Sequence, residues 1–175
     1  NIRHVVLYHL PYNEVEFNQM SGRAGRDGAA AQVHLLFGRG DACVNEQVLR
    51  DMTPDHDCLA QVYRRLRALQ RDHGDGFFTL GNVDLAKLAS EGGHAVSSQS
   101  AACGVAVFRE LGLIETHTAY ASGEITRSIR VVDTASKVEL TDSVRYREGL
   151  GERAIFSAFR DWAPGTDAAS LNVRV

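Results

Sequence analysis

Short apolar runs alternate with helical patterns over the first 52 residues of the chain. The run at 5–8 is almost continuously apolar, which is typical of a strand buried on both faces of a parallel sheet. Asn13 can cap a helix that ends in a glycine-rich stretch, and a second apolar run follows at 32–37. A strand, helix and strand over about 35 residues predict a parallel βαβ crossover. Two strands do not make a stable sheet domain, so we expect this unit to be incomplete and an upstream part of the protein to be missing.

A domain boundary is predicted near residue 53. Residues 41–52 can form one more helix, and the run Thr53-Pro54-Asp55 supplies a break followed by a new helix start. Beyond the break, apolar residues recur at helical spacing: Leu59, Val62, Leu66 and Leu69. Arginines occupy most of the opposite face, so the pattern predicts an amphipathic helix with a basic outer side.

The order of the elements that follow predicts a winged helix, the helix-turn-helix variant with a β-wing. A short helix is expected to start at residue 81 or 82, and Ser97 can cap a longer one. Two strand-like runs, 113–119 and 125–132, come next and are joined by a plausible hairpin turn. Three helices followed by a hairpin is the order of elements in a winged helix.

A final helix is predicted over residues 143–162. Its apolar stripe consists of Ile155, Ala158, Phe159 and Trp162, and Pro164 ends the element. We expect this helix to pack on the winged-helix domain. The predicted fold is an α/β fragment at 1–53, an α+β winged-helix domain at 54–141, and a C-terminal helix and tail at 142–175.

Composition narrows the classes of function. The 175 residues are 44% hydrophobic and carry a net charge of -3, so any nucleic-acid contact must come from local basic patches. Three widely spaced cysteines without a CxxC pair indicate reduced thiols and no zinc site. No apolar stretch is long enough to cross a bilayer, and the start lacks signal-peptide features. We therefore expect a cytoplasmic protein with no membrane partner.

The run QMSGRAGRDG at residues 19–28 carries the clearest chemistry in the sequence. Hydrolysis of ATP needs positive charge on the γ-phosphate, and a guanidinium supplies a fixed fork of donors that does not lose its proton. Arg23 and Arg26 are three residues apart and can both face a cleft. Gly22 and Gly25 permit close backbone approach to a neighbouring domain. The alternative interpretation is a glycine- and arginine-rich surface loop.

This run resembles motif VI of superfamily-two helicases in the version found in the RecQ family, and the resemblance extends over about residues 3–52. It implies the end of a second RecA-like domain, with Arg26 as arginine finger, Arg23 as its partner and Gln19 coupling the nucleotide to the first RecA-like domain. The sequence has no phosphate loop and no acidic run for magnesium. ATP and Mg²⁺ are thus expected in the full-length protein, and this chain alone should not hydrolyse ATP.

The stretch after residue 53 departs from the RecQ pattern. RecQ enzymes normally hold four zinc-binding cysteines there, whereas this sequence offers only Cys43 and Cys58. From about Pro54 the chain instead resembles the C-terminal domain of bacterial RecJ single-strand-specific exonucleases. The points of likeness are the helix at 59–69, the segment 108–114 and the run 143–162. A RecJ exonuclease with fused RecQ-like helicase domains would combine both halves. Asp55-His56-Asp57 resembles part of a metal site but is interpreted as a helix cap.

Several residues of the second half are candidates for contact with DNA. They are Ser97, Ser98 and Gln99 at a helix start, Arg127 and Arg130 on the wing, and Tyr120 at the hairpin tip. A helix N-terminus can bind phosphate through backbone N–H groups, and a tip tyrosine can stack on a base. The competing interpretations are that the serines only cap the helix, that the arginines form a solvated strand face, and that Tyr120 packs against the protein, which we prefer.

The densest basic group consists of Arg64, Arg65, Arg67 and Arg71, which can follow a phosphate backbone or form a solvated helix face. We predict the C-terminal region of a DNA repair or recombination enzyme that acts on single-stranded or forked DNA. The alternative is a non-catalytic winged-helix module that binds a protein such as single-strand-binding protein. A DEAD-box RNA helicase is less favoured, because that family has histidine at the position of Gln19.

Overall fold

The computed structural model describes residues 1–121, 124–134 and 137–163, and it separates into two compact units. The first unit combines Asn1–Leu49 with the chain from Gly151 onward, and the second is Arg50–Leu150. The observed division lies between Leu49 and Arg50, within a helix, slightly earlier than the predicted division after residue 53. The predicted C-terminal domain from residue 142 is shared between the two units.

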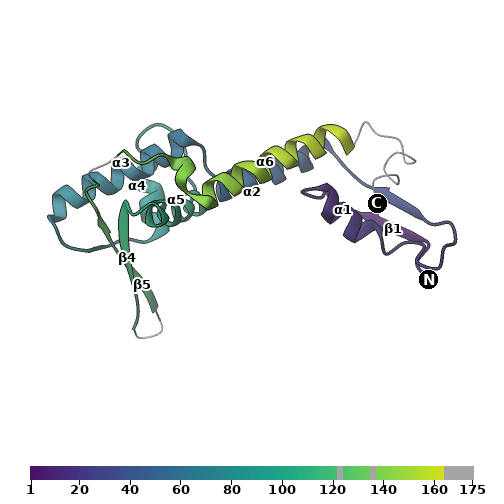
Figure 1. Ribbon diagram of the computed structural model, residues 1–175, viewed down its shortest axis with the longest axis horizontal. Helices are drawn as coiled ribbons and strands as arrows, with labels where there is room; N and C mark the ends of the chain where they lie inside the picture. The colour runs from purple at the N-terminus through teal and green to yellow at the C-terminus, as the bar shows by residue number, and fades with distance from the viewer. Residues whose placement is uncertain (122–123, 135–136, 164–175) are drawn as a thin grey trace. The chain divides into compact units, whose positions relative to one another are not determined.

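A parallel βαβ arrangement forms the first unit (Figure 1). Strand β1 (His4–Leu7) pairs in parallel with β2 (Gln32–Leu35), with Val5 opposite Val33. Helix α1 (Glu14–Ser21) connects them, and the side chain of Asn13 caps it by accepting a hydrogen bond from the backbone N–H of Glu16 at 2.8 Å. The predicted strand, helix and parallel strand are thus all present.

The core of this unit also draws on two long helices, α2 (Arg39–Met52) and α6 (Val144–Trp162). Its buried apolar side chains are Leu7, Leu10, Phe17, Leu49, Phe156, Phe159 and Ala163. Asn45 on α2 donates from Nδ2 to the backbone oxygen of Leu10 at 2.6 Å. Arg160 on α6 forms an ion pair with Glu46 on α2. These polar contacts join the helices to each other and to the segment after β1.

Only one face of the two-stranded sheet is covered by the described residues. Leu7 is buried and Val5 and Leu35 are partly buried on that face, whereas Val6 is 40% exposed on the other. The rings of His4 and His34 stack on the exposed face with centroids 5.5 Å apart. The expectation that β1 is buried on both faces is therefore wrong for this unit, because no described element lies against the second face.

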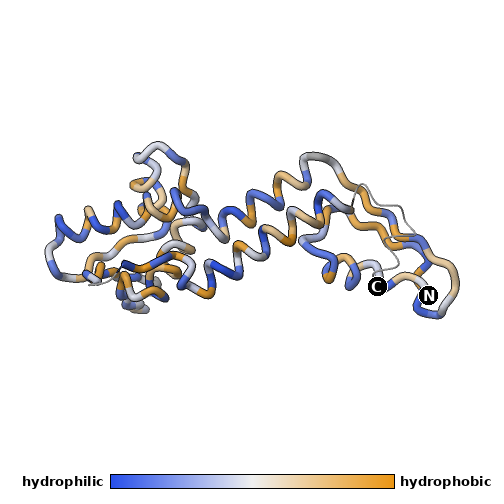
Figure 2. Tube along the Cα trace, turned by 45° about the horizontal axis from the view of Figure 1, so that its top comes forward, coloured by the Kyte–Doolittle hydropathy of each residue, from blue (hydrophilic) through white to orange (hydrophobic). Residues whose placement is uncertain are grey.

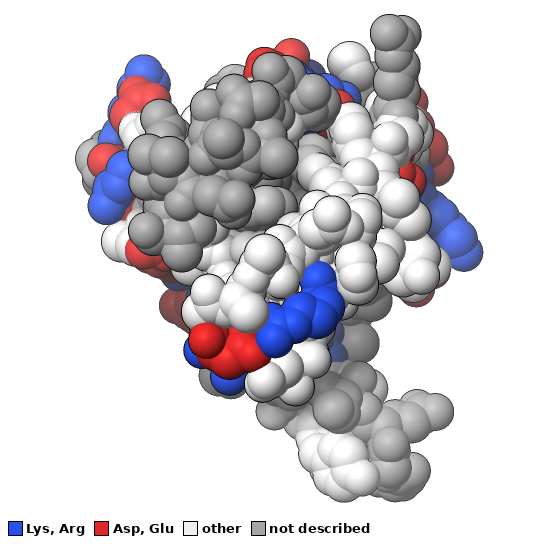
Figure 3. Space-filling model, turned by 90° about the vertical axis from the view of Figure 1, so that its right-hand side faces the viewer, with Lys and Arg blue, Asp and Glu red and all other residues white. Residues whose placement is uncertain are grey.

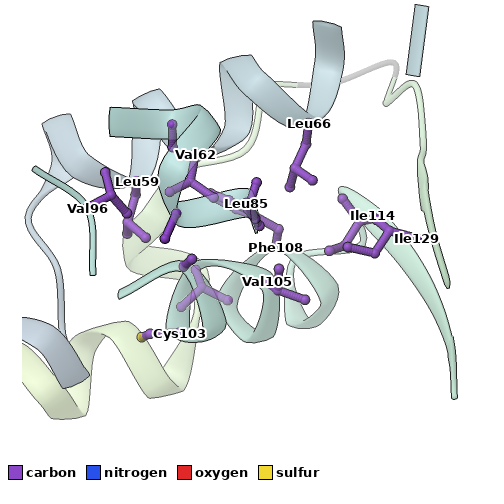
Figure 4. Close-up of a cluster of buried hydrophobic side chains, with 14 of the residues drawn as sticks. Leu59, Val62, Leu66, Leu85, Val96, Cys103, Val105, Phe108, Ile114 and Ile129 are labelled. Atoms are coloured by element: carbon purple, nitrogen blue, oxygen red, sulfur yellow. The ribbon is translucent and has the colours of Figure 1, made fainter. Parts of the chain in front are cut away.

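Three helices build the second unit: α3 (His56–His73), α4 (Asn82–Ser90) and α5 (Ser98–Glu110). Their apolar stripes converge on one core, in which Leu59, Leu66 and Leu85 are fully buried (Figure 4). The alternation of hydrophobic and hydrophilic positions that produces these stripes is visible along the helices in Figure 2. Burial of such side chains contributes about 25 cal/mol for each Å² of apolar surface removed from water.

The helix ends follow local signals in the sequence. Asp55 caps α3 by accepting a hydrogen bond from the N–H of Cys58 at 2.9 Å, as the capping interpretation of that run predicts. Helix α5 ends at Glu110, and just beyond its C-cap Leu111 lies Gly112, whose φ of 69° is favourable for glycine. The N–H of Leu113 then reaches back to the backbone oxygen of Phe108 at 2.8 Å, which closes the helix end.

A three-stranded antiparallel sheet completes the second unit, in the order β3–β5–β4. The hairpin strands β4 (Ile114–Ala121) and β5 (Glu124–Val131) were predicted from the sequence. The short strand β3 (Phe78–Thr79) was not, and it places Phe78 opposite Ile129. Both of these side chains are buried, so β3 anchors the hairpin to the helical core.

Helix α6 follows a short 3-10 turn, η1 (Leu140–Asp142), and matches the predicted helix in length but only partly in its buried face. Ile155, expected in the core, is 56% exposed, and Ala158 is also exposed. Phe156 is buried in its place, in the first unit, while Phe159 and Trp162 of the predicted stripe do contribute to that core. Only the beginning of the helix, at Tyr146, joins the core of the second unit. The expectation that the whole helix packs on the 54–141 domain is therefore wrong.

No helix among the described residues is both long and apolar enough to span a bilayer. The predicted ending of the last helix at Pro164 and the tail beyond it lie outside the described residues, as does the centre of the predicted hairpin turn, residues 122–123.

Candidate functional site

The run at 19–28 begins on the last turns of α1 and continues as a loop toward β2. Gln19 is exposed on the helix, and Gly22 ends it by donating its N–H to the backbone oxygen of Asn18 at 2.8 Å. Arg26 folds back over this helix end, with its Nε donating to the backbone oxygen of Gly22 at 3.3 Å. The position of Arg26 is thus tied to the C-terminus of α1.

Gly25 needs to be glycine for two reasons. Its φ is 63°, a region that side chains disfavour, and a Cβ at this position would lie 2.8 Å from the backbone oxygen of Ala29. Its N–H donates to the backbone oxygen of Ile2 at 3.0 Å. The loop therefore lies against the residues that lead into β1.

Asp27 fixes the other half of the loop. Its two carboxylate oxygens accept hydrogen bonds from the two terminal nitrogens of Arg3, at 2.8 and 2.5 Å. The hydrogen bond from Arg3 is the main cause that lowers the pKa of Asp27 below its usual value. The sequence interpretation gave neither residue a role, although opposite charges at a strand start and in the loop were visible. This fork-to-fork geometry is the strongest form of an arginine–carboxylate contact.

We expect the loop anchor to depend on pH in the acidic range. Because folding lowers the pKa of Asp27, the ion pair contributes above the ordinary aspartate pKa of about 3.9 and is lost as the pH falls through the folded value. Arg3→Ala should raise the pKa of Asp27 toward its ordinary value, as followed by NMR titration of the carboxyl carbon. The matched variant Arg109→Ala, on an exposed part of α5, should leave that titration unchanged. An unshifted Asp27 in Arg3→Ala would contradict the anchor.

Arg23 and Arg26 remain available on this anchored loop. Both are exposed, and neither has an acidic partner within the described parts of the chain. The loop backbone beside them borders a hollow of about 360 Å³, whose lining includes Gly22, Gly25 and Gly28. Two unpaired guanidinium groups beside open backbone can receive an anionic group from outside the unit. Within the described residues no cluster of metal-ligating side chains accompanies them.

The four arginines of α3 do not form one free basic surface. Arg65 donates to the backbone oxygen of Leu88 at 2.9 Å and forms an ion pair with Glu91, and Arg67 lies 3.5 Å from a carboxylate oxygen of Asp133. Arg64 and Arg71 are exposed and have no acidic partner in the described part of the chain. These two are seven positions apart, which places them about 10 Å apart along the same side of the helix.

The start of α5 is mainly a capping structure. Ser97 accepts a hydrogen bond from the N–H of Ser100 at 3.0 Å, as the capping interpretation predicts. The hydroxyl of Ser100 in turn donates to Asp51 at 3.3 Å, which places negative charge beside the helix start. Ser98 and Gln99 are exposed. A carboxylate near the helix N-terminus competes with any phosphate for the same positive potential, so this location is less suited to DNA.

The wing arginines are held by other parts of the second unit. Arg127 is half-buried, donates from Nη2 to Asn82 at 2.5 Å, and has its pKa lowered by burial. Arg130 pairs with Glu115 at 2.5 Å. Tyr120 is 75% exposed at the end of β4, so the preferred prediction that it packs against the protein is wrong. Its exposure leaves the ring free for stacking.

A cluster of exposed aromatic side chains on the sheet was missed by the sequence interpretation. The ring of Phe77 meets that of His117 edge to face with centroids 4.5 Å apart, and the guanidinium of Arg130 lies 4.9 Å from the Phe77 centroid. The phenylalanine pair at 77–78 was the available signal, since alternation along a strand places one of the two residues outside. The face of the molecule shown in Figure 3 carries small groups of positive and negative side chains that lie next to each other.

The three cysteines, Cys43, Cys58 and Cys103, form no disulfide. Burial raises the pKa of Cys58 to about 11. The thiol of Cys103 donates to the backbone oxygen of Met52 at 2.9 Å. A thiol with a raised pKa is a weak nucleophile, so Cys58 and Cys103, whose pKa values are raised by burial, are structural in character.

Comparison with known proteins finds a partial match to a DNA helicase. Over 66 residues, 38% of this chain, the sequence is 38% identical to a probable ATP-dependent DNA helicase RecS of Bacillus subtilis. The matched part covers 13% of that helicase, so the chain corresponds to a small share of it. No family model and no solved structure matches the chain. The match supports the predicted relationship to RecQ-like helicases and gives no support to an attached RecJ exonuclease.

Proposed function

We propose that this chain is the C-terminal region of an ATP-dependent DNA helicase of the RecQ-like type, with a role in DNA repair or recombination. The observation that carries the proposal is the pair of exposed guanidinium groups, Arg23 and Arg26, on an anchored glycine-rich loop between two parallel strands. The partial match to a DNA helicase supports the same assignment. In this proposal the first unit is the end of a second RecA-like domain.

The proposed role of the loop is to complete a nucleotide site that another domain holds. ATP and Mg²⁺ would be bound by the first RecA-like domain, with Arg26 placed on the γ-phosphate and Arg23 beside it. Gln19, about one helical turn before Arg23, would couple that nucleotide to the first RecA-like domain. The Arg3–Asp27 pair keeps the loop in place, which lowers the cost of bringing both guanidinium groups to the phosphate.

The second unit is proposed to be a winged helix that contacts single-stranded or forked DNA. Its three helices, hairpin and exposed Tyr120 support this assignment. The arginines that remain free for phosphates are Arg64 and Arg71, since Arg65 and Arg67 have acidic partners. The DNA interface is therefore smaller than the sequence interpretation implied.

Salt-dependent DNA binding tests this assignment. The double variant Arg64→Ala, Arg71→Ala should bind single-stranded DNA more weakly than the wild type. The steepness of the plot of log binding constant against log salt concentration should fall by roughly 0.7 for each lost phosphate contact. Arg67→Ala is the matched control on the same helix, because its guanidinium already faces Asp133. Fluorescence anisotropy titrations at several salt concentrations measure both quantities. Equal slopes in the double variant and the wild type would remove these arginines from the interface.

The alternative function, a non-catalytic module that binds a protein such as single-strand-binding protein, is favoured by one observation. Four of the predicted DNA-contacting arginines are already engaged within the unit: Arg65, Arg67, Arg127 and Arg130. A chain that shows little salt-dependent DNA binding but retains affinity for such a protein would favour this alternative. The attachment of a RecJ-type exonuclease stays a prediction from the sequence resemblance.

A further inference from the structure

A hollow of about 370 Å³ lies between α3 and α4 in the second unit. Gln61, Arg64 and Ala68 line it from α3, and Leu88, Ala89 and Gly92 line it from α4 and the turn that follows. Its volume falls within the range of small-molecule sites, which is about 300 to 1,000 Å³. Arg65 and Glu91 complete the lining, and Ala68, Ala89 and Gly92 are its small residues.

Gln61 is the unusual residue of this hollow. Its side chain is only 6% exposed, and its Oε1 atom is buried without any hydrogen-bond partner. A buried acceptor left without a donor is unfavourable for folding, and native proteins rarely keep one without a reason. Gly92 packs closely against this amide, since a Cβ there would lie 3.2 Å from Oε1. Gln61 is also one of the residues that line the hollow, so its amide borders that space.

Arg64 provides positive charge at the same hollow. Its Nε donates to the backbone oxygen of Ala60 at 3.2 Å, which orients the side chain along the helix. Its terminal nitrogens have no acidic partner among the residues described. Arg65, by contrast, is neutralised by Glu91. One hollow thus combines a buried carboxamide, the Arg64 guanidinium, the Arg65–Glu91 ion pair and the apolar side chains of Ala68, Leu88 and Ala89.

We propose that this hollow binds an adenine nucleotide, with the base edge at Gln61 and the phosphate at Arg64. A glutamine carboxamide presents an acceptor beside a donor, which matches the amino group and ring nitrogen on one edge of adenine. The flat, apolar part of the base suits walls of alanine and leucine. The nucleotide can come from a DNA strand or from free solution. The first of these sources rests on the proposed DNA-binding function and adds a base preference to it.

The test compares ligands that differ only in the base. With the 175-residue chain, oligo(dA) should bind more tightly than oligo(dT) of the same length by roughly 5- to 150-fold, the range for one bidentate contact. Gln61→Leu has nearly the same shape, removes the unsatisfied acceptor and should erase this preference without lowering the melting temperature. Gly92→Ala should reduce the preference by crowding the amide. Gln32→Leu, on the exposed face of β2, is the matched control and should retain it.

A second arm separates the two sources of the nucleotide. Binding of AMP but not TMP, followed by NMR shifts of residues in α3 and α4, identifies a free nucleotide as a ligand. Preference for oligo(dA) without an AMP effect identifies the DNA strand. Arg64→Ala should weaken both kinds of binding several-fold. Equal binding of oligo(dA) and oligo(dT), together with no response to AMP, overturns the inference. The proposed function would still stand in that case, because the chain would still bind DNA. A preference unchanged in Gln61→Leu also overturns it.

Discussion

Arg26→Ala should lower DNA-stimulated ATP hydrolysis by roughly 10³- to 10⁵-fold in a protein that joins this chain to its first RecA-like domain. The reason is that negative charge spreads over the γ-phosphate oxygens in the transition state, and an arginine finger stabilises it there. Arg26 is exposed and unpaired, and its Nε contact with Gly22 does not use the terminal nitrogens. Steady-state ATPase assays with and without DNA measure the effect.

Two further variants separate charge from geometry. Arg26→Lys retains the positive charge but loses the fork of donors, so it should restore only part of the activity. Arg109→Ala removes the same charge from an exposed site on α5 and should leave the rate unchanged. DNA affinity should be the same in all three variants, because the loop belongs to the first unit. ATPase activity retained in Arg26→Ala would overturn the finger assignment.

Phe108→Ala should destabilise the second unit by about 3 to 5 kcal/mol. Phe108 is 2% exposed, and its ring packs against that of Tyr63 with centroids 5.1 Å apart. Helix α5 also approaches α3 closely at Gly104, where a Cβ would lie 3.3 Å from the side chains of Leu59 and Val62. A cavity at Phe108 cannot collapse easily, because the surrounding helices are held by these close contacts.

Urea unfolding followed by far-ultraviolet circular dichroism measures this loss. Val83→Ala is the matched control, since Val83 is 56% exposed on α4 and its truncation should change the free energy of unfolding by less than about 0.5 kcal/mol. A loss below about 1 kcal/mol in Phe108→Ala would mean that α5 does not pack in the core as described.

Elements with strong local signals were predicted well. Leu59, Val62 and Leu66 recur at helical spacing and are all fully buried in α3. The caps at Asn13 and Asp55 also form as predicted, because a cap involves residues only three positions apart. Patterns of this kind depend on the chain itself and not on its distant neighbours.

Elements whose partners are distant were predicted less well. The two-residue strand β3 is too short for a periodic signal and exists because Phe78 pairs with Ile129 on β5. On α6, Phe159 is buried as predicted, but Ile155 is not, since Ile155 and Phe156 are both apolar and only the packing in the first unit selects Phe156. Tyr120 was expected to pack, but nothing described lies against the end of β4 to cover it.

The sequence by itself determined the helices, their caps and the guanidinium-bearing loop at 19–28, because these depend on residue type and short spacing. Only the tertiary structure decided which arginines remain free. The partners of Arg65, Arg127 and Arg130 lie 26, 45 and 15 residues away along the chain. Folding brings these groups into contact, and an ion pair or hydrogen bond within the unit removes a guanidinium from the set available to phosphates.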